Sequence, residues 1–272
     1  MSAVDLLFAD LKRQGRKALL PFVTAGDPDI GFTAQLIRTL ADAGASMCEI
    51  GVPYSDPIAD GPVIQAAYQR ALARGFKLPQ LFELGASIRE SIAMPLVTMV
   101  SFSILHRVGL SNYIQQAIAA GYSGAIVPDL LVEEAHSVAA VCRDFDFSLI
   151  QLVTPTTPRQ RQVRIAESSS GFLYYVSVTG ITGERTSLPV EALENVRWLK
   201  EQTQLPICVG FGVSNSETAR ALAPVADGVI VGSAFVRRIA RATDGDRQTV
   251  LADVRRFAKE LLAGLNDASV AT

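Results

Sequence analysis

Eight short runs rich in apolar and β-branched residues recur along the chain, and stretches with helical periodicity separate them. This alternation predicts βα units, in which helices connect parallel strands. Most of the runs are continuously apolar, which is typical of strands that are buried on both faces. A closed sheet with helices outside explains this burial better than an open sheet. The expected strands lie at residues 18–23, 47–52, 96–102, 124–127, 148–153, 172–178, 207–211 and 228–231.

The number of strands and the length of 272 residues together predict one (β/α)8 barrel, of the TIM-barrel class, over residues 1–272. No linker or low-complexity tract marks a domain boundary. Residues 2–14 predict an additional N-terminal helix that closes the bottom of the barrel. Ser214 and Glu217 have the spacing of a capping box, which predicts that a helix begins there. The last helix is expected to pack on the barrel through an apolar stripe of Val250, Leu251, Val254, Phe257, Ala258, Leu261 and Leu262.

Charge and cysteine content exclude several classes of protein. The 27 acidic and 25 basic side chains leave a net charge of −2, so nucleic acid and anionic membrane surfaces are poor candidates for partners. No segment offers the roughly 18–20 uninterrupted apolar residues of a membrane-spanning helix. The first residues lack the features of a signal peptide, so we expect a cytoplasmic protein. The three cysteines, Cys48, Cys142 and Cys208, have no paired spacing, which predicts neither disulfides nor a metal site but buried thiols.

Acidic residues follow the second expected strand, and the catalytic groups of such barrels lie at the carboxyl ends of the strands. Glu49 interrupts an apolar run, and Asp56 and Asp60 lie in the loop that follows it. Burial raises the pKa of a carboxyl group toward the range that proton transfer at neutral pH requires. The alternative for Glu49 is a structural acid that binds a lysine or a backbone donor. The alternative for Asp56 and Asp60 is the stabilisation of a turn.

Glycine-containing turns follow the sixth, seventh and eighth expected strands, at residues 179–186, 210–212 and 232–233. Barrel enzymes bind phosphate in this region through backbone amides at helix starts, where glycine permits close approach. Each turn alone is explained by turn geometry, but three that converge on one side of the rim predict a phosphorylated substrate. We expect the loops at 54–62 and 179–188 to open and close over it.

Aromatic residues complete the set of candidates. Phe22 and Tyr174 stand near strand ends, where they can enclose a flat ring, although each also suits the core. His106 and His136 are far apart in the sequence and distant from any serine elbow, so a serine hydrolase has no support. We expect both histidines to be structural or surface residues.

Three segments of the chain, residues 20–28, 49–62 and 179–183, resemble the alpha chain family of tryptophan synthase. The middle segment is highly specific, and the likeness extends over roughly residues 18–235. The resemblance implies a lyase that cleaves indole-3-glycerol phosphate to indole and glyceraldehyde 3-phosphate by acid–base retro-aldol chemistry. It implies no cofactor in this chain. It also implies a beta chain, dependent on pyridoxal phosphate, that receives the indole in an α2β2 assembly.

The resemblance assigns roles to particular residues. It makes Glu49 the acid that protonates indole C3 and Asp60 the carboxylate near the indole N1–H. It also implies contacts to the substrate from Phe22, Tyr174, Thr182, Gly183, Phe211, Gly212, Gly232 and Ser233. The aromatic members contact the indole, and the glycines and Ser233 bind the phosphate.

Some positions depart from the family pattern. Residues 100–104 and Leu131 differ from the segments found in many relatives, and both lie on the rim used for subunit contact. Val178 stands where some relatives have arginine, so no cationic contact is expected there. Three alternatives remain open: an autonomous lyase, a chiefly allosteric binding subunit of the beta chain, and an unrelated phosphosugar isomerase on the same fold.

Overall fold

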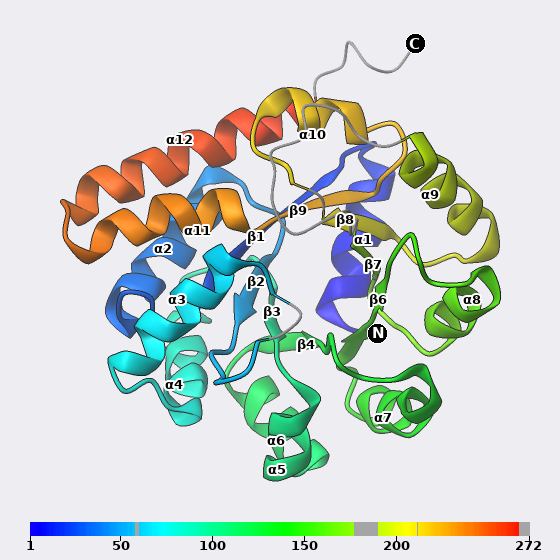
Figure 1. Cartoon of the computed structure of the whole chain (residues 1–272), viewed down its shortest axis with the longest axis horizontal. Helices are drawn as coiled ribbons and strands as arrows, with labels where there is room; N and C mark the ends of the chain where they lie inside the picture. The colour runs from blue at the N-terminus through cyan, green and yellow to red at the C-terminus, as the bar shows by residue number, and fades with distance from the viewer. Residues whose placement is uncertain (58–59, 177–189, 211, 267–272) are drawn as a thin grey trace.

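The computed structural model describes residues 1–57, 60–176, 190–210 and 212–266. Helices surround a sheet of parallel strands that curves on itself (Figure 1). The strands are β1 (Ala18–Thr24), β2 (Cys48–Gly51), β3 (Leu96–Met99), β4 (Tyr122–Ile126), β5 (Ser148–Ile150), β6 (Leu152–Val153), β7 (Leu173–Val176), β8 (Ile207–Gly210) and β9 (Gly228–Val231). The helices are α1 (Ala3–Arg13), α2 (Ile30–Ala43), α3 (Pro62–Ala73), α4 (Leu78–Ile88), α5 (Phe102–Val108), α6 (Leu110–Ala119), α7 (Val132–Asp144), α8 (Arg159–Glu167), α9 (Val190–Gln202), α10 (Ser216–Leu222), α11 (Ser233–Ala240), the short 3-10 helix η1 (Arg241–Thr243) and α12 (Arg247–Asn266).

The strands follow the order β5-β4-β3-β2-β1-β9-β8-β7-β6, so the two edge strands are consecutive in sequence. The sequence predicts eight strands, and the described chain has nine because the run at 148–153 divides at Gln151. Its first half pairs with β4, and its second half pairs with β7. The Gln151 carbonyl still accepts a hydrogen bond from the Tyr174 amide at 3.1 Å, which carries the chain across the seam. The (β/α)8 barrel predicted from the sequence is therefore confirmed.

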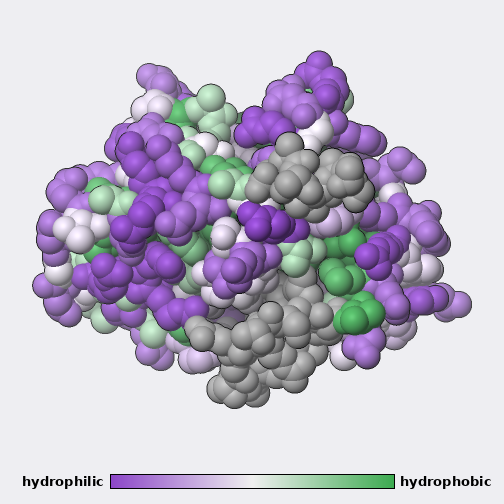
Figure 2. Space-filling view, turned by 90° about the horizontal axis from the view of Figure 1, so that it is seen from above, coloured by the Kyte–Doolittle hydropathy of each residue, from purple (hydrophilic) through white to green (hydrophobic). Residues whose placement is uncertain are grey.

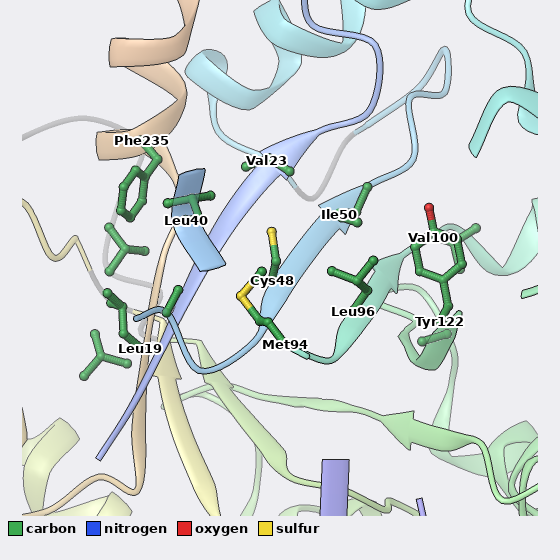
Figure 3. Packing of buried hydrophobic residues seen from close by; sticks show 14 of the residues in the cluster. Leu19, Val23, Leu40, Cys48, Ile50, Met94, Leu96, Val100, Tyr122 and Phe235 are labelled. Atoms are coloured by element: carbon green, nitrogen blue, oxygen red, sulfur yellow. The ribbon is translucent and has the colours of Figure 1, made fainter. Parts of the chain in front are cut away.

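Alternating residues of each strand build two hydrophobic layers. In β1, Leu19 and Val23 face the outer layer between strands and helices, whereas Leu20 and Phe22 face the barrel interior. Figure 3 shows the outer layer, in which side chains of β1, β2 and β3 meet helical residues such as Leu40. Hydrophilic side chains dominate the coloured surface of the face drawn in Figure 2. Side chains that face the barrel interior are therefore available for core packing or for a functional site.

Helix α1 closes the amino-terminal end of the barrel, as predicted. Ser2 caps it, with its hydroxyl accepting from the Asp5 amide and the Asp5 carboxylate accepting from the Ser2 amide. Phe8 is 5% exposed and contacts the Phe172 ring at a centroid distance of 5.7 Å. Val4 and the other buried residues of this helix join the interior cluster. The barrel interior is thus covered at this end, and the candidate residues lie toward the carboxyl ends of the strands, called the mouth below.

The long C-terminal helix packs through the predicted stripe, of which Val254 and Leu261 are fully buried. The start of α10 differs from the prediction. Asn215 caps this helix, and its side chain accepts from the Thr218 amide at 2.9 Å, so Ser214 is not the cap. Both residues are good N-caps, and a one-residue shift in backbone path decides between them. Within the described residues, no helix has the length and apolar character needed to cross a membrane.

Candidate active site

Glu49 lies inside the barrel on β2, where it is paired in register with Phe22 of β1 and Val97 of β3. Its side chain is fully buried, and neither carboxyl oxygen has a hydrogen-bond partner among the described residues. The alternative of a structural acid therefore finds neither a lysine nor a backbone donor in the part of the chain that the structure describes. Burial raises the pKa of Glu49 to about 8, and the charge of Asp60 adds to the increase. The side chain is thus mostly protonated at neutral pH.

Asp60 stands at the end of the loop between β2 and α3 and is partly buried. Burial raises its pKa to about 6, so it is mostly ionised at pH 7. No hydrogen bond to its carboxylate comes from the described part of the chain. The turn is instead held by Gln65, whose Nε2 donates to the carbonyls of Asp60 at 2.7 Å and Pro57 at 3.2 Å. The carboxylate is left available, and residues 58–59 beside it lie outside the described residues.

Aromatic side chains and glycines fit together around these carboxylates. A Cβ atom at Gly51 would lie 2.7 Å from Phe22 Cε2 and 2.7 Å from Tyr68 Oη, so only glycine leaves room for both rings. A Cβ atom at Gly210 would lie 2.6 Å from Tyr174 Oη. Phe22 is 2% exposed. The two predicted aromatic candidates therefore contact the interior face of the mouth next to strand glycines.

Tyr68 and Tyr54 were missed by the sequence analysis. Tyr68 comes from α3, and its ring centroid lies 5.8 Å from that of Tyr54. Burial, followed by the charges of Asp60 and Glu49, raises the pKa of Tyr68 well above its usual value, so the hydroxyl keeps its proton. Tyr54 lies in the loop at 54–62, which the sequence marks by its acidic residues, and Tyr68 lies on a helix, whereas the predicted candidates come from strand ends and loops. The signal for Tyr68 in the sequence is that its helix directly follows the acidic loop.

Two of the remaining candidates, Gly232 and Ser233, lie where β9 leads into α11. Gly232 precedes α11, and its carbonyl accepts from the amides of Phe235 at 2.9 Å and Val236 at 3.1 Å. The first amides of a helix have no intrahelical partner, so the Ser233 amide at the start of α11 is available to a ligand. A Cβ atom at Gly232 would lie 3.9 Å from Phe22 Cβ, which ties this helix start to the aromatic wall. Gly212 borders open space. Phe211, Thr182, Gly183 and Val178 lie outside the described residues.

Comparison with known proteins decides the family. The model of the family described as tryptophan synthase alpha chain matches residues 8–265. A tryptophan synthase alpha chain from Rhodopirellula baltica is 60% identical over 263 residues, which cover 96% of this chain and 95% of that one. The chain belongs to the tryptophan synthase alpha chain family. It is therefore a carbon–carbon lyase of tryptophan biosynthesis and the alpha subunit of a tryptophan synthase, as the resemblance implied.

Solved structures of the tryptophan synthase alpha family share the fold. The alpha chain from Legionella pneumophila subsp. pneumophila has a TM-score of 0.88 at 32% identity and covers 99% of each chain. A chain of tryptophan synthase from M. tuberculosis in its aminoacrylate-bound form has a TM-score of 0.86 at 30% identity, with 98% of this chain and 100% of that chain covered. These likenesses support the alternation of strands and helices described above.

Other polar candidates lie away from the mouth. His106 on α5 is exposed and contacts the Phe102 ring at 6.4 Å, and His136 is exposed on α7. Both are surface residues, as predicted. In the described ranges, no group of three or more His, Cys, Asp or Glu side chains is arranged to hold a metal. The cysteines are free and buried, as predicted for inert thiols: Cys48, Cys142 and Cys208.

Proposed function

We propose that Glu49 carries the central proton transfers in the cleavage of indole-3-glycerol phosphate to indole and glyceraldehyde 3-phosphate. The observation that supports this role is a fully buried carboxyl group without any hydrogen-bond partner among the described residues, whose pKa of about 8 keeps the proton on the acid at neutral pH. A carboxyl group in this state is able to donate a proton without first breaking an internal bond.

The cleavage needs one proton delivered and one removed. Glu49 donates its proton to C3 of the indole ring, which converts the ring to an iminium-like cation. Removal of the proton from the C3′ hydroxyl then lets that oxygen form the aldehyde carbonyl as the carbon–carbon bond breaks. The electron pair of the broken bond returns to the indole ring and restores its aromaticity. Glu49, now ionised, accepts the hydroxyl proton and is regenerated, so no external acid, base or redox partner is required.

Asp60 stabilises the cationic intermediate. Its pKa of about 6 leaves it mostly ionised at neutral pH, and its charge raises the pKa values of both Glu49 and Tyr68, which supports a role close to the proton transfer. A carboxylate beside the indole N1–H is favourable when positive charge develops on that nitrogen. The same charge opposes ionisation of Glu49, so the pair holds one acid and one base at pH 7.

The two ends of the substrate meet different surfaces. We assign the indole to Phe22, Tyr174 and Phe211, because flat apolar rings favour offset or edge contacts with aromatic side chains. We assign the phosphate to backbone amides and one hydroxyl, from Thr182, Gly183, Gly212, Gly232 and Ser233.

The partner is a beta chain that is dependent on pyridoxal phosphate, in an allosteric α2β2 assembly. A groove of about 840 Å3 on the rim supports this docking, because it is lined by Tyr54 next to the acidic loop and by Ser101 and Asp129. Asp129 accepts from the Ser101 hydroxyl and the Phe102 amide, both at 2.7 Å, which orders the segment that departs from the family pattern. Leu131 is 56% exposed beside it. We place the assembly in the cytoplasm, where buried free thiols persist.

The test is release of indole from indole-3-glycerol phosphate by Glu49→Gln, with and without added beta chain. We expect a loss of at least about 10³-fold, because general acid–base groups contribute roughly 10²- to 10⁴-fold each. Glu83→Gln, at an exposed position of α4, is the matched control and should retain parental activity. Residual cleavage within a few-fold of the parent would overturn the assignment.

The same variant separates the alternatives. A chiefly allosteric subunit would still stimulate the beta chain's conversion of indole to tryptophan when Glu49→Gln has lost its own cleavage. An autonomous lyase would turn over steadily with no beta chain present. A phosphosugar isomerase would not respond to indole-3-glycerol phosphate at all.

A further inference from the structure

A second cavity lies at the end of the barrel opposite the mouth. We call it the basal pocket; it has a volume of about 300 Å3 and lies between α1, the turn that follows α1 and the turn before β8. Its wall is apolar where Phe8 and Leu11 of α1 meet Leu205 and Pro206. Phe8 is held in place by its contact with the Phe172 ring, so this wall is part of the packed core. The volume is at the lower end of the range of small-molecule sites, about 300–1,000 Å3.

The rim of the basal pocket carries an excess of positive charge. Four cationic residues line it, with one carboxylate: Lys12, Arg16, Lys17, Lys200 and Asp227. The carboxylate is already engaged on both oxygens. Lys200 Nζ donates to Asp227 Oδ1 at 2.8 Å, and the Ile207 amide donates to Asp227 Oδ2 at 2.9 Å. Three cationic groups therefore remain without a carboxylate in the described part of the chain.

Lys17 is the most constrained of the three. Its backbone amide donates to Asn266 Oδ1 at 2.8 Å, which fixes the residue between α12 and β1. The side chain is half-buried, and burial lowers the pKa of its ammonium group, with the charge of Asp227 opposing this and that of Lys200 adding to it. This ammonium group donates no hydrogen bond to a described residue and forms no ion pair with one. Among the described residues, the guanidinium of Arg16 nearby donates only to the neutral Gln14 side chain, at 3.2 Å.

We propose that the basal pocket binds a small organic anion, namely a phosphate or carboxylate group carried on an apolar ring. Lys17 and Arg16 would contact the anionic group, and the apolar wall of α1 would contact the ring. An anion there would supply the charge that Lys17 lacks and would cover apolar surface at the same time. This site is separate from the catalytic mouth and does not depend on the proposed reaction.

The proposal is tested by nuclear magnetic resonance titration of the full chain with phenyl phosphate, inorganic phosphate and phenol. The amides of Gly15 and Leu205 report on the basal pocket, and those of Gly212 and Gly232 report on the mouth. We expect phenyl phosphate to shift the Gly15 and Leu205 signals saturably, with at least tenfold higher affinity than inorganic phosphate or phenol. Shifts confined to the mouth would overturn the proposal, as would equal affinity for phenol.

Matched variants locate the charge that binds. Arg16→Gln with Lys17→Gln should weaken phenyl phosphate at least tenfold at the Gly15 signal and leave the signals of the mouth unchanged. Arg13→Gln is the control, because Arg13 is exposed on the same helix but pairs with Asp10 at 2.7 Å and does not line the pocket. It should bind as the parent does. If the Lys17 variant does not fold, Lys12→Gln with Arg16→Gln, both exposed, replaces it under the same criteria; parental affinity in whichever double variant folds refutes the proposal.

Discussion

Two buried carboxyl groups at neighbouring strands of the barrel differ in whether a cation is paired with them. Asp27, just beyond β1, is 1% exposed and accepts hydrogen bonds from the Arg70 guanidinium at 2.9 and 2.7 Å. Glu49 on β2 is 0% exposed and accepts none from the described chain. The fold therefore supplies a cation where a buried carboxylate serves structure. Burial alone does not distinguish a structural carboxyl group from one available for chemistry. Glu49 differs from Asp27 in being buried without a partner among the described residues, so no pairing offsets its desolvation.

The largest effect should follow from removing the partner of Asp27. Arg70→Met leaves that carboxylate buried and unpaired, and we expect it to lower the free energy of unfolding by about 3 kcal/mol, the lower end for a buried pair because Arg70 is partly exposed. Glu49→Gln should not destabilise the fold, since it removes an unpaired acid. Urea denaturation measures both. Arg74→Met, exposed at the end of the same helix, is the control, and a loss equal to that of Arg70→Met would show that the pair contributes nothing.

Sequence patterns carried much of the fold, because the periodicities that define strands and the stripe of α12 are local. The division of one strand at Gln151 could not be predicted, since it depends on which neighbour each half pairs with. The choice of Asn215 over Ser214 as a helix cap likewise depends on the backbone path. In each case the sequence is compatible with two local arrangements, and contacts with the rest of the fold decide between them.

In the candidate site, too, the sequence indicates some features, whereas others depend on tertiary packing. Glu49 is visible in the sequence as a charge inside an apolar strand, but its lack of a partner is a property of every residue packed around it. Tyr68 follows the acidic loop in sequence, but its place at the mouth depends on the missing side chain of Gly51 on another element, which the sequence does not show. Sequence thus indicates which groups bear chemistry, and packing decides which of them are left unpaired.

The absence of a partner for Glu49 should make the stability of the chain depend on pH. The pKa of Glu49 is about 8 in the folded chain and near 4.5 when unfolded, so between these values the folded state binds the extra proton. The free energy of unfolding should therefore fall as pH rises from about 6 to 8, relative to that of Glu49→Gln, by an amount on the order of 2 kcal/mol. Denaturant titrations of parent and variant at both pH values measure this difference. Parallel stability curves would mean that Glu49 has a partner or access to solvent.

Asp60→Asn should have a smaller effect, on rate. We expect turnover to fall by at least about tenfold, which corresponds to roughly 1.4 kcal/mol of transition-state stabilisation. In the parent, kcat/KM should rise through pH 6 as Asp60 ionises and fall above pH 8 as Glu49 loses its proton. The variant should lose the rise near pH 6 and keep the fall. A larger change in substrate affinity than in turnover would count against the assignment.

The smallest expected effects concern two buried tyrosines, one with a hydrogen-bond partner and one without. Tyr113 donates its hydroxyl proton to Thr98 at 2.9 Å in the outer layer, whereas the Tyr68 hydroxyl has no hydrogen-bond partner in the described ranges and stays protonated beside two carboxyl groups. Tyr113→Phe should lower stability by about 1 kcal/mol, the usual net value of one hydrogen bond, and leave kcat/KM unchanged. Tyr68→Phe should do the reverse, lowering kcat/KM about threefold, roughly 0.6 kcal/mol, with unchanged stability. If both variants alter only stability, the absence of a partner does not distinguish residues of the site from those of the core.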